Sequence, residues 1–256
     1  MAAVERISVY PVKGLDGIDV ETTEILDGGT FKYDREFALF DTDGDVLNGK
    51  RTEQIHDLST DFDPVSKTFS VETTDGEIEQ FDLDTDDETA AEWFSDYFSV
   101  DLKLRRDPSL GFVDRREMGP SVISTATLET VASWFDEVTV DGARRRLRAN
   151  LEVSGVPAFW EDRFVGDDAP AFGVDGVRFE GMTPCGRCIV PERDPDTGTR
   201  TTDFRERFIR NRERTFPEWA DSRAFDHYYS VMTIARIPRA HRGRTVGVGD
   251  SVEVIE

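Results

Sequence analysis

The sequence predicts a β-rich α+β fold in two parts, and three features of the residue pattern support this prediction. Asp-Gly pairs separate apolar or β-branched runs at three places, which is the strongest short-range signal for a hairpin. Helical spacing of apolar residues occurs in only a few segments, and strands and helices do not alternate regularly. Residues 101–120 are poor in apolar residues and contain two prolines and two Arg-Arg pairs, as expected of a boundary between subdomains.

Three Asp-Gly pairs mark the predicted hairpin turns. They are Asp43-Gly44, Asp75-Gly76 and Asp175-Gly176. The stretch DTDGD around the first pair also allows a calcium-loop interpretation, because closely spaced aspartates are typical of such loops. Its glycine does not stand at the sixth loop position and no glutamate follows at the ligating spacing, so we favour the hairpin.

Helical spacing predicts helices within residues 86–100 and 124–135. In the first segment, one face carries the apolar side chains Ala90, Trp93, Phe94, Tyr97 and Phe98. The second segment has the same periodicity and begins with Ser124 or Thr125 as its N-cap. We expect a third helix, polar and exposed, over residues 201–214, and two short strands over residues 245–255.

The charge balance argues against several classes of partner. The 256-residue chain has a formal net charge of −22, which disfavours contact with nucleic acid and with anionic membranes. We expect a cytoplasmic protein, because no apolar segment resembles a signal peptide or a membrane-spanning helix. Lysine is scarce, with 5 residues against 26 arginines. An acidic, lysine-poor chain of this kind predicts a halophilic source, and a melting temperature that fails to rise in molar KCl would contradict it.

Both cysteines lie in one short motif, CGRC at residues 185–188. Such a pair is compatible with half of a zinc site, a dithiol redox centre, a thiolate ligand for another metal, or simple packing. Zinc would need two more ligands, and the candidate histidines lack the usual H-x₃₋₅-H spacing: His56, His227 and His241. A thioredoxin-type helix after the motif is disfavoured, because Pro191 and the turn-forming DPDTG follow closely.

Basic and hydroxyl-bearing segments elsewhere in the chain could contribute to a ligand site together with this motif. Arg187 stands between the thiols, where its fixed charge would stabilise a thiolate or bind an oxyanion. Lys13 and Arg35 add cations from the N-terminal half, and residues 121–127 offer hydroxyls at a predicted strand-to-helix junction, a common phosphate site. Residues 144–150 are expected to be extended, and at strand spacing three side chains would share one side: Arg146, Arg148 and Asn150. Each group alone is compatible with a surface ion pair, but together they indicate an anionic, phosphate-bearing ligand.

Longer motifs give a family resemblance that covers almost the whole chain. In order, they are YPVKGLDGI, KYDREFALFDTDG, ISTATL, RRRLRANLEVSG, EDRFVG, CGRCIVPERDPDTG, FDHYYSV and TVGVGDSVEV. The series resembles MOSC-domain proteins, specifically their amidoxime-reducing group, and DPDTG after an Arg-Cys is its most specific element. The resemblance implies a MOSC β-barrel domain over residues 111–256 packed against a smaller β-rich N-terminal domain over residues 1–110. It also implies a molybdenum cofactor, molybdenum bound to molybdopterin, between the two domains.

The resemblance also assigns roles to residues. Cys188, directly after the arginine, would ligate molybdenum, whereas Cys185 corresponds to a position that is not a ligand. The other implied cofactor-binding positions are Lys13, Gly14, Arg35, Ser124, Thr125, Thr127, Arg148, Asn150, Gly186, Arg187 and Tyr228. The family often has serine where Gly14 stands and threonines after the Arg-Cys-Ile where this chain has Val190, Pro191 and Glu192. One side-chain contact is therefore lost, and the substrate preference is left open.

The implied activity is two-electron reduction of N-hydroxylated or N-oxide small molecules at a cysteine-ligated molybdenum, with Arg187 stabilising charge on the leaving oxygen. No cysteine remains to hold an iron–sulfur cluster, so we expect a separate electron-donor protein of the ferredoxin or flavoprotein type. Two alternatives stay open. One is a cofactor carrier or sulfur-transfer protein with a persulfide on Cys188, and the other is a binding domain without catalysis.

Overall fold

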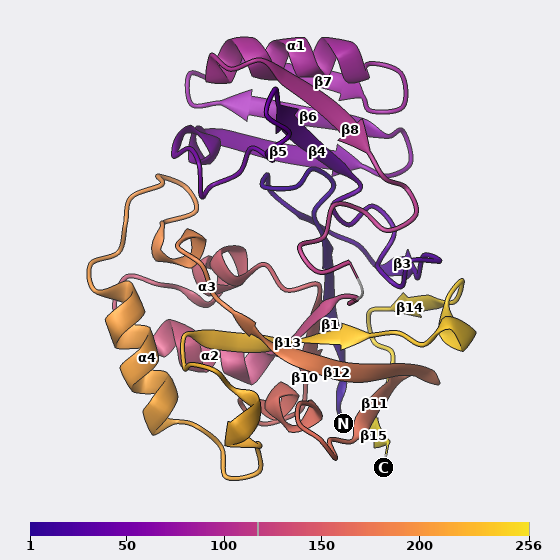
Figure 1. Cartoon of the computed structure of the whole chain (residues 1–256), viewed down its shortest axis with the longest axis vertical. Helices are drawn as coiled ribbons and strands as arrows, with labels where there is room; N and C mark the ends of the chain where they lie inside the picture. The colour runs from indigo at the N-terminus through magenta and orange to yellow at the C-terminus, as the bar shows by residue number, and fades with distance from the viewer. Residues whose placement is uncertain (117, 256) are drawn as a thin grey trace.

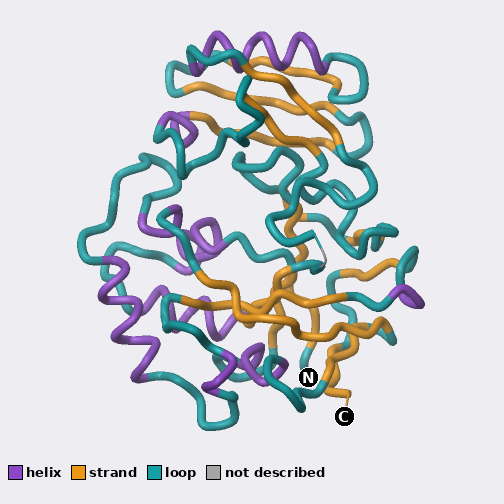
Figure 2. Tube along the Cα trace, in the orientation of Figure 1, coloured by secondary structure: helices purple, strands orange, loops and turns teal. Residues whose placement is uncertain are grey.

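The computed structural model describes residues 1–116 and 118–255, and in Figure 1 they form an upper and a lower body. The lower body is built on an eight-stranded sheet with the order β15-β11-β12-β13-β9-β10-β1-β2. Its strands are β1 (Ala3–Val9), β2 (Ile18–Asp19), β9 (Ser121–Ser124), β10 (Leu151–Ser154), β11 (Ala171–Val174), β12 (Val177–Gly186), β13 (Ser230–Arg236) and β15 (Val252–Ile255). Figure 2 shows strands in both bodies, and with 32% strand against 23% helix the predicted β-rich fold with few helices is confirmed.

The upper body contains two small sheets and one helix. β4 (Phe37–Asp41) pairs with β8 (Leu102–Arg106), and β5 (Leu58–Asp63), β6 (Thr68–Thr73) and β7 (Ile78–Asp82) form a three-stranded meander. Helix α1 (Asp87–Phe98) covers them and buries Ala90, Phe94 and Phe98, which lie four residues apart on one face. This is the face that the apolar spacing predicts, and the helix ends at Ser99 in a left-handed cap.

All three Asp-Gly turns form hairpins, as predicted. Asp75-Gly76 joins β6 to β7, and Asp175-Gly176 joins β11 to β12. Asp43-Gly44 closes a shorter hairpin in which Phe40 pairs with Val46. The glycine has a positive φ in each turn, between 76° and 85°, which a residue without Cβ adopts at little cost.

The lower body has three helices: α2 (Thr125–Ser133), α3 (Val140–Leu147) and α4 (Phe204–Arg214). Helix α2 packs against β9 and β10, and α3 packs against α2. The predicted N-cap of α2 is confirmed, because the Ser124 hydroxyl accepts the Thr127 N–H. The helix predicted within residues 201–214 is present, but it is exposed on only part of its surface. One face of α4 is buried, because Phe208 packs against the rings of Trp134 and Tyr229.

Short 3-10 turns and a small sheet complete the fold. The turns are η1 (Gln54–Asp57), η2 (Trp160–Phe164), η3 (Val190–Glu192), η4 (Ser222–Ala224) and η5 (Arg239–His241). The two strands predicted over residues 245–255 are present as β14 (Thr245–Gly247) and β15, but they do not pair with each other. β14 pairs with β3 (Thr22–Glu24), and β15 pairs with β11.

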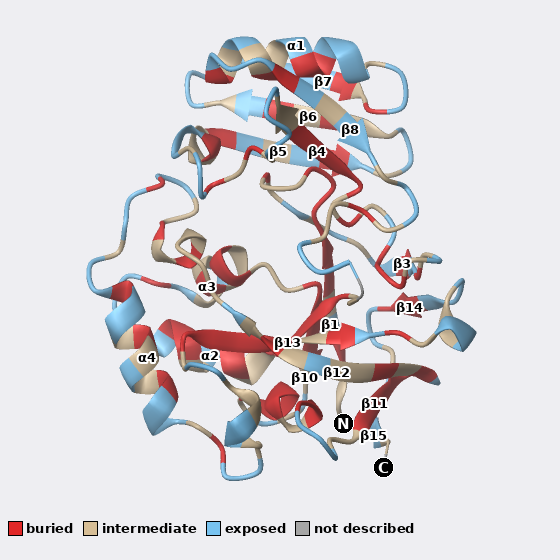
Figure 3. Ribbon diagram, in the orientation of Figure 1, coloured by how far each residue is buried: buried red, intermediate tan, exposed pale blue. Residues whose placement is uncertain are grey.

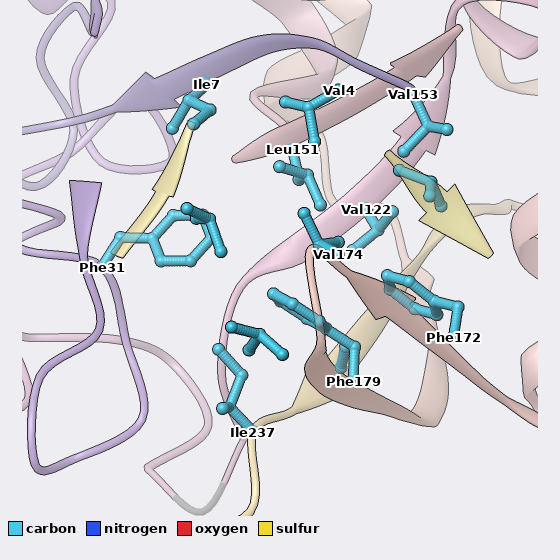
Figure 4. Packing of buried hydrophobic residues seen from close by; sticks show 14 of the residues in the cluster. Val4, Ile7, Phe31, Val122, Leu151, Val153, Phe172, Val174, Phe179 and Ile237 are labelled. Carbon is cyan, nitrogen blue, oxygen red and sulfur yellow. The ribbon is translucent and has the colours of Figure 1, made fainter. Parts of the chain in front are cut away.

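Strands β1, β2 and β3, all within the first 25 residues, belong to the sheets of the lower body. β1 pairs with β10 and β2, and β3 pairs with β14 near the C-terminus. Val4 and Ile7 of β1 join the core of the lower body beside Leu151 and Val153, as Figure 4 shows. A division of the sequence at residue 110 is therefore not a division in space. The chain begins in the lower body and only then enters the upper one.

Burial follows this arrangement, with a separate apolar core for the upper body and two clusters for the lower one (Figure 3). Strand β1 leads upward from the lower core and places the residues that follow it between the bodies (Figure 1). In the described residues, no helix combines the length and the apolar character that crossing a membrane requires.

Candidate functional site

A cavity of about 420 Å³ lies between residues of both bodies. The upper body and the N-terminal segment contribute Lys13, Arg35, Asn48, Ile55 and His56, and the lower body contributes Arg146, Arg148, Cys185, Cys188 and Arg193. Among the described residues, nine lysines and arginines line the cavity against three aspartates. In a chain with a net charge of −22, such a local excess of cations marks a site for an anion.

The two cysteines reach the cavity where β12 leaves the sheet. Cys185, Gly186, Arg187 and Cys188 all line it. The Arg187 backbone N–H donates to the Tyr229 carbonyl at 2.8 Å, and its guanidinium donates to the Leu147 carbonyl at 3.0 Å and to Cys185 Sγ at 3.1 Å. The positive charge is therefore held in place, and it touches the Cys185 sulfur.

Tyr229 contacts the backbone of Cys188, the predicted metal ligand. Its hydroxyl donates to the Cys188 carbonyl at 3.2 Å, and its ring is buried. Tyr228, the tyrosine named from the sequence, does not line the cavity and packs against Phe216 with ring centroids 5.4 Å apart. The structure thus places the neighbouring tyrosine beside the cysteine motif. Both tyrosines directly precede β13, and the motif alone does not decide which of the two faces inward.

The prediction that residues 144–150 are extended is wrong. These residues form the last turn of α3, the left-handed C-cap Arg148, and the link to β10. Thr139 caps the start of α3 by accepting the Gly142 N–H at 2.9 Å, and the arginines of the last turn suit the negative end of the helix dipole. Nevertheless, the three side chains expected to face the ligand line the cavity: Arg146, Arg148 and Asn150.

Arg148 and Arg35 meet at the ring of Tyr10. The guanidinium carbons lie 4.1 Å and 4.8 Å from the ring centroid, respectively. Arg35 is paired with the Asp34 carboxylate, whereas Arg148 donates to the Leu15 carbonyl at 2.6 Å. Burial lowers the pKa of Arg148, and the nearby charge of Arg35 acts in the same direction.

Lys13 and Gly14 form one edge of the cavity. Lys13 Nζ donates to the Phe112 carbonyl at 2.7 Å and forms an ion pair with Asp114. Gly14 has a φ of +98°, and a Cβ added there would lie 3.1 Å from Cβ of Asn48. The glycine is thus required by backbone conformation and by close packing, which explains why serine does not stand at this position.

Three more polar side chains lie near the loop after Cys188. Arg146 and Arg193 are 4% and 6% exposed, and their terminal nitrogens donate to carbonyls of residues 191–198. Arg193 also pairs with Glu53 of the upper body at 2.8 Å. Burial and the charge of Arg193 lower the pKa of His56, while a hydrogen bond to the Pro195 backbone opposes them.

The buried Nε atoms of three cavity arginines, Arg146, Arg187 and Arg193, have no hydrogen-bond partner among the described residues. Sequence reasoning considered His56 only as a zinc ligand and did not single out Arg193. The signal for Arg193 was its place directly before DPDTG.

The hydroxyls expected at the α2 junction do not reach the cavity. Ser124 and Thr127 are fully buried, and their hydroxyls lie 2.8 Å apart. Thr127 also accepts the Phe159 N–H at 2.6 Å, and Thr125 is not among the cavity residues. These side chains cap a helix instead of facing a ligand, and Ser121 lines the cavity in their place.

Asn150 lines the cavity, but its side chain is occupied by structural bonds. Its carbonyl oxygen accepts from the Ser121 N–H at 3.1 Å and from the Ser121 hydroxyl at 3.0 Å, and its amide donates to the Ser8 carbonyl at 3.2 Å. Of the residues named from the sequence, the structure brings together Lys13, Gly14, Arg35, Arg148, Asn150, Gly186, Arg187 and Cys188. In the described chain, no three His, Cys, Asp or Glu side chains form a group that could hold a metal ion.

Comparison with known proteins gives two family matches. Residues 1–101 match the MOSC N-terminal beta barrel domain, and residues 117–253, more than half of the chain, match the MOSC domain. The chain is 24% identical over 235 residues to the molybdenum cofactor sulfurase of Drosophila erecta, covering 76% of this chain and 29% of that protein. It is 23% identical over 241 residues to mitochondrial amidoxime reducing component 2 of Rattus norvegicus, covering 77% of this chain and 68% of that protein. The chain spans less than a third of the length of the sulfurase relatives.

These matches cover both bodies and include the cysteine motif at the cavity. The chain belongs to the MOSC-domain family.

Proposed function

We propose that this chain binds a molybdenum cofactor in the cavity, with Cys188 as the protein ligand of the metal, and reduces N-hydroxylated or N-oxide small molecules by two electrons. The observation that carries the proposal is the charge of the cavity around Cys188. Nine cations and three carboxylates line the cavity, and four of the cations form no ion pair among the described residues: Lys50, Arg115, Arg148 and Arg187. Three buried guanidinium Nε atoms also lack an acceptor among those residues. The similarity to proteins named molybdenum cofactor sulfurase and mitochondrial amidoxime reducing component 2 also supports this proposal.

The residues present fit an anionic, phosphate-bearing cofactor. Guanidinium groups bind phosphate oxygens through charge-assisted, often bidentate hydrogen bonds. A buried N–H without an acceptor is costly, so a ligand oxygen that accepts from it gains the full value of the bond. Arg35, Arg148 and Lys13 would bind the phosphate and pterin from one side, and Arg146 and Arg193 would close the cavity along the loop after Cys188.

Cys188 and Arg187 would carry the chemistry of the site. A thiolate is a soft ligand suited to a transition metal, and Tyr229 holds the Cys188 backbone in place. When bound, the cofactor supplies a molybdenum centre that exchanges an oxygen atom for two electrons. Arg187, fixed by the Leu147 carbonyl, would stabilise negative charge on the substrate oxygen as it leaves. A separate electron-donor protein of the ferredoxin or flavoprotein type would supply the electrons.

The substrate end of the cavity would be partly apolar. Ile55, Leu58, Val190 and Pro195 line the cavity, the first two from the upper body. Val190 follows the cysteine motif at a position where the family often has threonine, so a less polar substrate is expected here.

A second candidate is a sulfur-transfer or cofactor-carrier protein with a persulfide on Cys188. The observation that favours it is the match to proteins named molybdenum cofactor sulfurase, which covers 76% of this chain. The two candidates differ in what Cys188 Sγ is bonded to. A reductase needs a metal–sulfur bond, and a sulfur carrier needs a sulfur–sulfur bond.

The deciding experiment is elemental analysis of the chain purified from a host that makes the cofactor. About one molybdenum per chain is expected, with loss of the metal in Cys188→Ala and retention in the matched control Cys185→Ala. The metal-loaded chain should then reduce hydroxylamines, amidoximes or N-oxides with a chemical electron donor. Intact-mass analysis that finds 32 Da of added sulfur on Cys188 and no metal would favour the carrier. A chain with no molybdenum, no fluorescence of oxidised pterin and no added sulfur would refute both.

A further inference from the structure

Tyr10 connects the two arginines that come from different parts of the cavity. It follows β1 directly, is 5% exposed, and is not itself a cavity residue. Its backbone N–H donates to Asp34 Oδ1 at 3.2 Å, and its carbonyl accepts the Arg35 N–H at 2.7 Å. Its hydroxyl donates to the Ala149 carbonyl at 3.2 Å, next to Arg148. One residue is therefore tied to the Asp34-Arg35 turn at its backbone and to the end of α3 at its hydroxyl.

Both arginines approach the ring from an unusual backbone conformation. Arg35 has a φ of 56° and Arg148 a φ of 59°, in the left-handed region that residues other than glycine rarely adopt. Their guanidinium carbons lie 4.8 Å and 4.1 Å from the centroid of the Tyr10 ring. The face of an aromatic ring attracts cations, so the ring holds two like charges near one point.

Only one of these two cations is neutralised within the chain. Asp34 pairs with Arg35, whereas Arg148 forms no ion pair with a carboxylate of the described residues and relies on the Leu15 carbonyl and the ring. Two adjacent guanidinium groups with a single carboxylate leave one positive charge open to the cavity. A phosphate group, with two negative charges and several acceptor oxygens, fits this arrangement.

We propose that Tyr10 is a positioning residue of the site, and that its ring holds Arg35 and Arg148 together so that both bind the phosphate group of the ligand. The inference rests on the proposed function only in that the cavity takes a phosphate-bearing ligand. Tyr10 acts as a neutral ring: burial raises the pKa of its hydroxyl to about 12, so it carries no charge at ordinary pH.

The test is calorimetric titration of the cofactor-free full chain with inorganic phosphate at one fixed KCl concentration. Tyr10→Leu, which removes the ring, should weaken phosphate binding about tenfold, the scale of a buried cation–π contact. Tyr10→Phe keeps the ring and loses only the bond to Ala149, so it should bind within about twofold of the natural chain. Tyr10→Met serves as a second ring-deleting variant if Tyr10→Leu does not fold.

A double-mutant cycle separates positioning from a merely structural role. If Tyr10 acts through Arg148, then Tyr10→Leu should cost clearly less affinity in an Arg148→Gln background than in the natural chain. Ring-deleting variants that bind phosphate as tightly as the natural chain would overturn the proposal. An equal loss in both backgrounds would overturn it as well. If the natural chain itself binds no phosphate, the phosphate site of the proposed function fails instead, so the two failures are distinguishable.

Discussion

Two arginines of this protein, the buried Arg212 and the half-buried Arg148, have opposite surroundings. Arg212, on α4, is fully buried, pairs with Asp162, donates to the Ser230 carbonyl at 3.2 Å, and lies 4.3 Å from the ring of Phe159. Arg148, at the end of α3, has a carbonyl and the Tyr10 ring as partners and forms no ion pair among the described residues.

The difference separates a charge that builds the fold from a charge that is available to the proposed site. A buried charge is costly unless it is paired, so a protein that leaves one unpaired toward a cavity gives up stability there. Such a charge indicates a ligand of opposite sign. The pairing of Arg212 indicates only that α4 must be held against the sheet.

The largest expected effect comes from breaking the buried ion pair between Arg212 and Asp162. Arg212→Met should lower the free energy of unfolding by about 3–5 kcal/mol, because it leaves the Asp162 carboxylate buried without its partner. Urea denaturation measures this loss. Arg210→Met, at an exposed position of the same helix, is the matched control and should stay within about 0.5 kcal/mol of the natural chain. Equal effects of the two substitutions would show that the buried pair does not hold α4 in place.

The same buried cluster should give the protein a pH-dependent stability. Burial, followed by the charge of Asp162, raises the pKa of Glu161 to about 8 from an ordinary 4.5. Between these two values the folded chain holds a proton that the unfolded chain lacks. The contribution of Glu161 is therefore complete below about pH 4.5 and is lost as the pH rises to about 8.

Glu161→Gln should remove that dependence, because glutamine has the shape of the protonated acid. Relative to this variant, the natural chain should lose up to about 1.4 kcal/mol of unfolding free energy per pH unit across the window. Urea denaturation at pH 5, 7 and 9 measures the slope, with exposed Glu129→Gln as the control. Parallel curves for the natural chain and Glu161→Gln would mean that Glu161 is ionised in the fold throughout.

The comparison also shows which features the sequence could predict. The hairpins, the face of α1 and the cap of α2 depend on neighbours within a few residues, and each of these predictions is confirmed. Cys188 and Arg187 share one short motif, so their proximity required no knowledge of the fold. Arg148 lines the cavity as predicted, but the strand from which this was predicted does not form. The residue pattern in RRRLRAN also suits the last turn of a helix and its cap.

Features that depend on contacts between distant segments could not be predicted from local sequence patterns. The Ser124 and Thr127 hydroxyls suit a phosphate site and a helix cap equally well, and only the position of the cavity distinguishes the two roles. The contact between Arg193 and Glu53 joins residues 140 positions apart, and no local pattern predicts it. The contacts of Tyr10 with Arg35 and Arg148 likewise join three separate segments, which no single motif contains.

The smallest expected change in stability is the most informative about function. Arg148→Gln removes a half-buried cation without a carboxylate partner, so the free energy of unfolding without added ligand should change by no more than about 1 kcal/mol. The rise in melting temperature on adding phosphate should nevertheless shrink, because that rise reports binding to the folded state. Thermal melts with and without phosphate measure both quantities, and Arg212→Met supplies the opposite pattern. If Arg148→Gln instead destabilises the chain as much as Arg212→Met does, Arg148 is a structural residue and its open charge says nothing about a ligand.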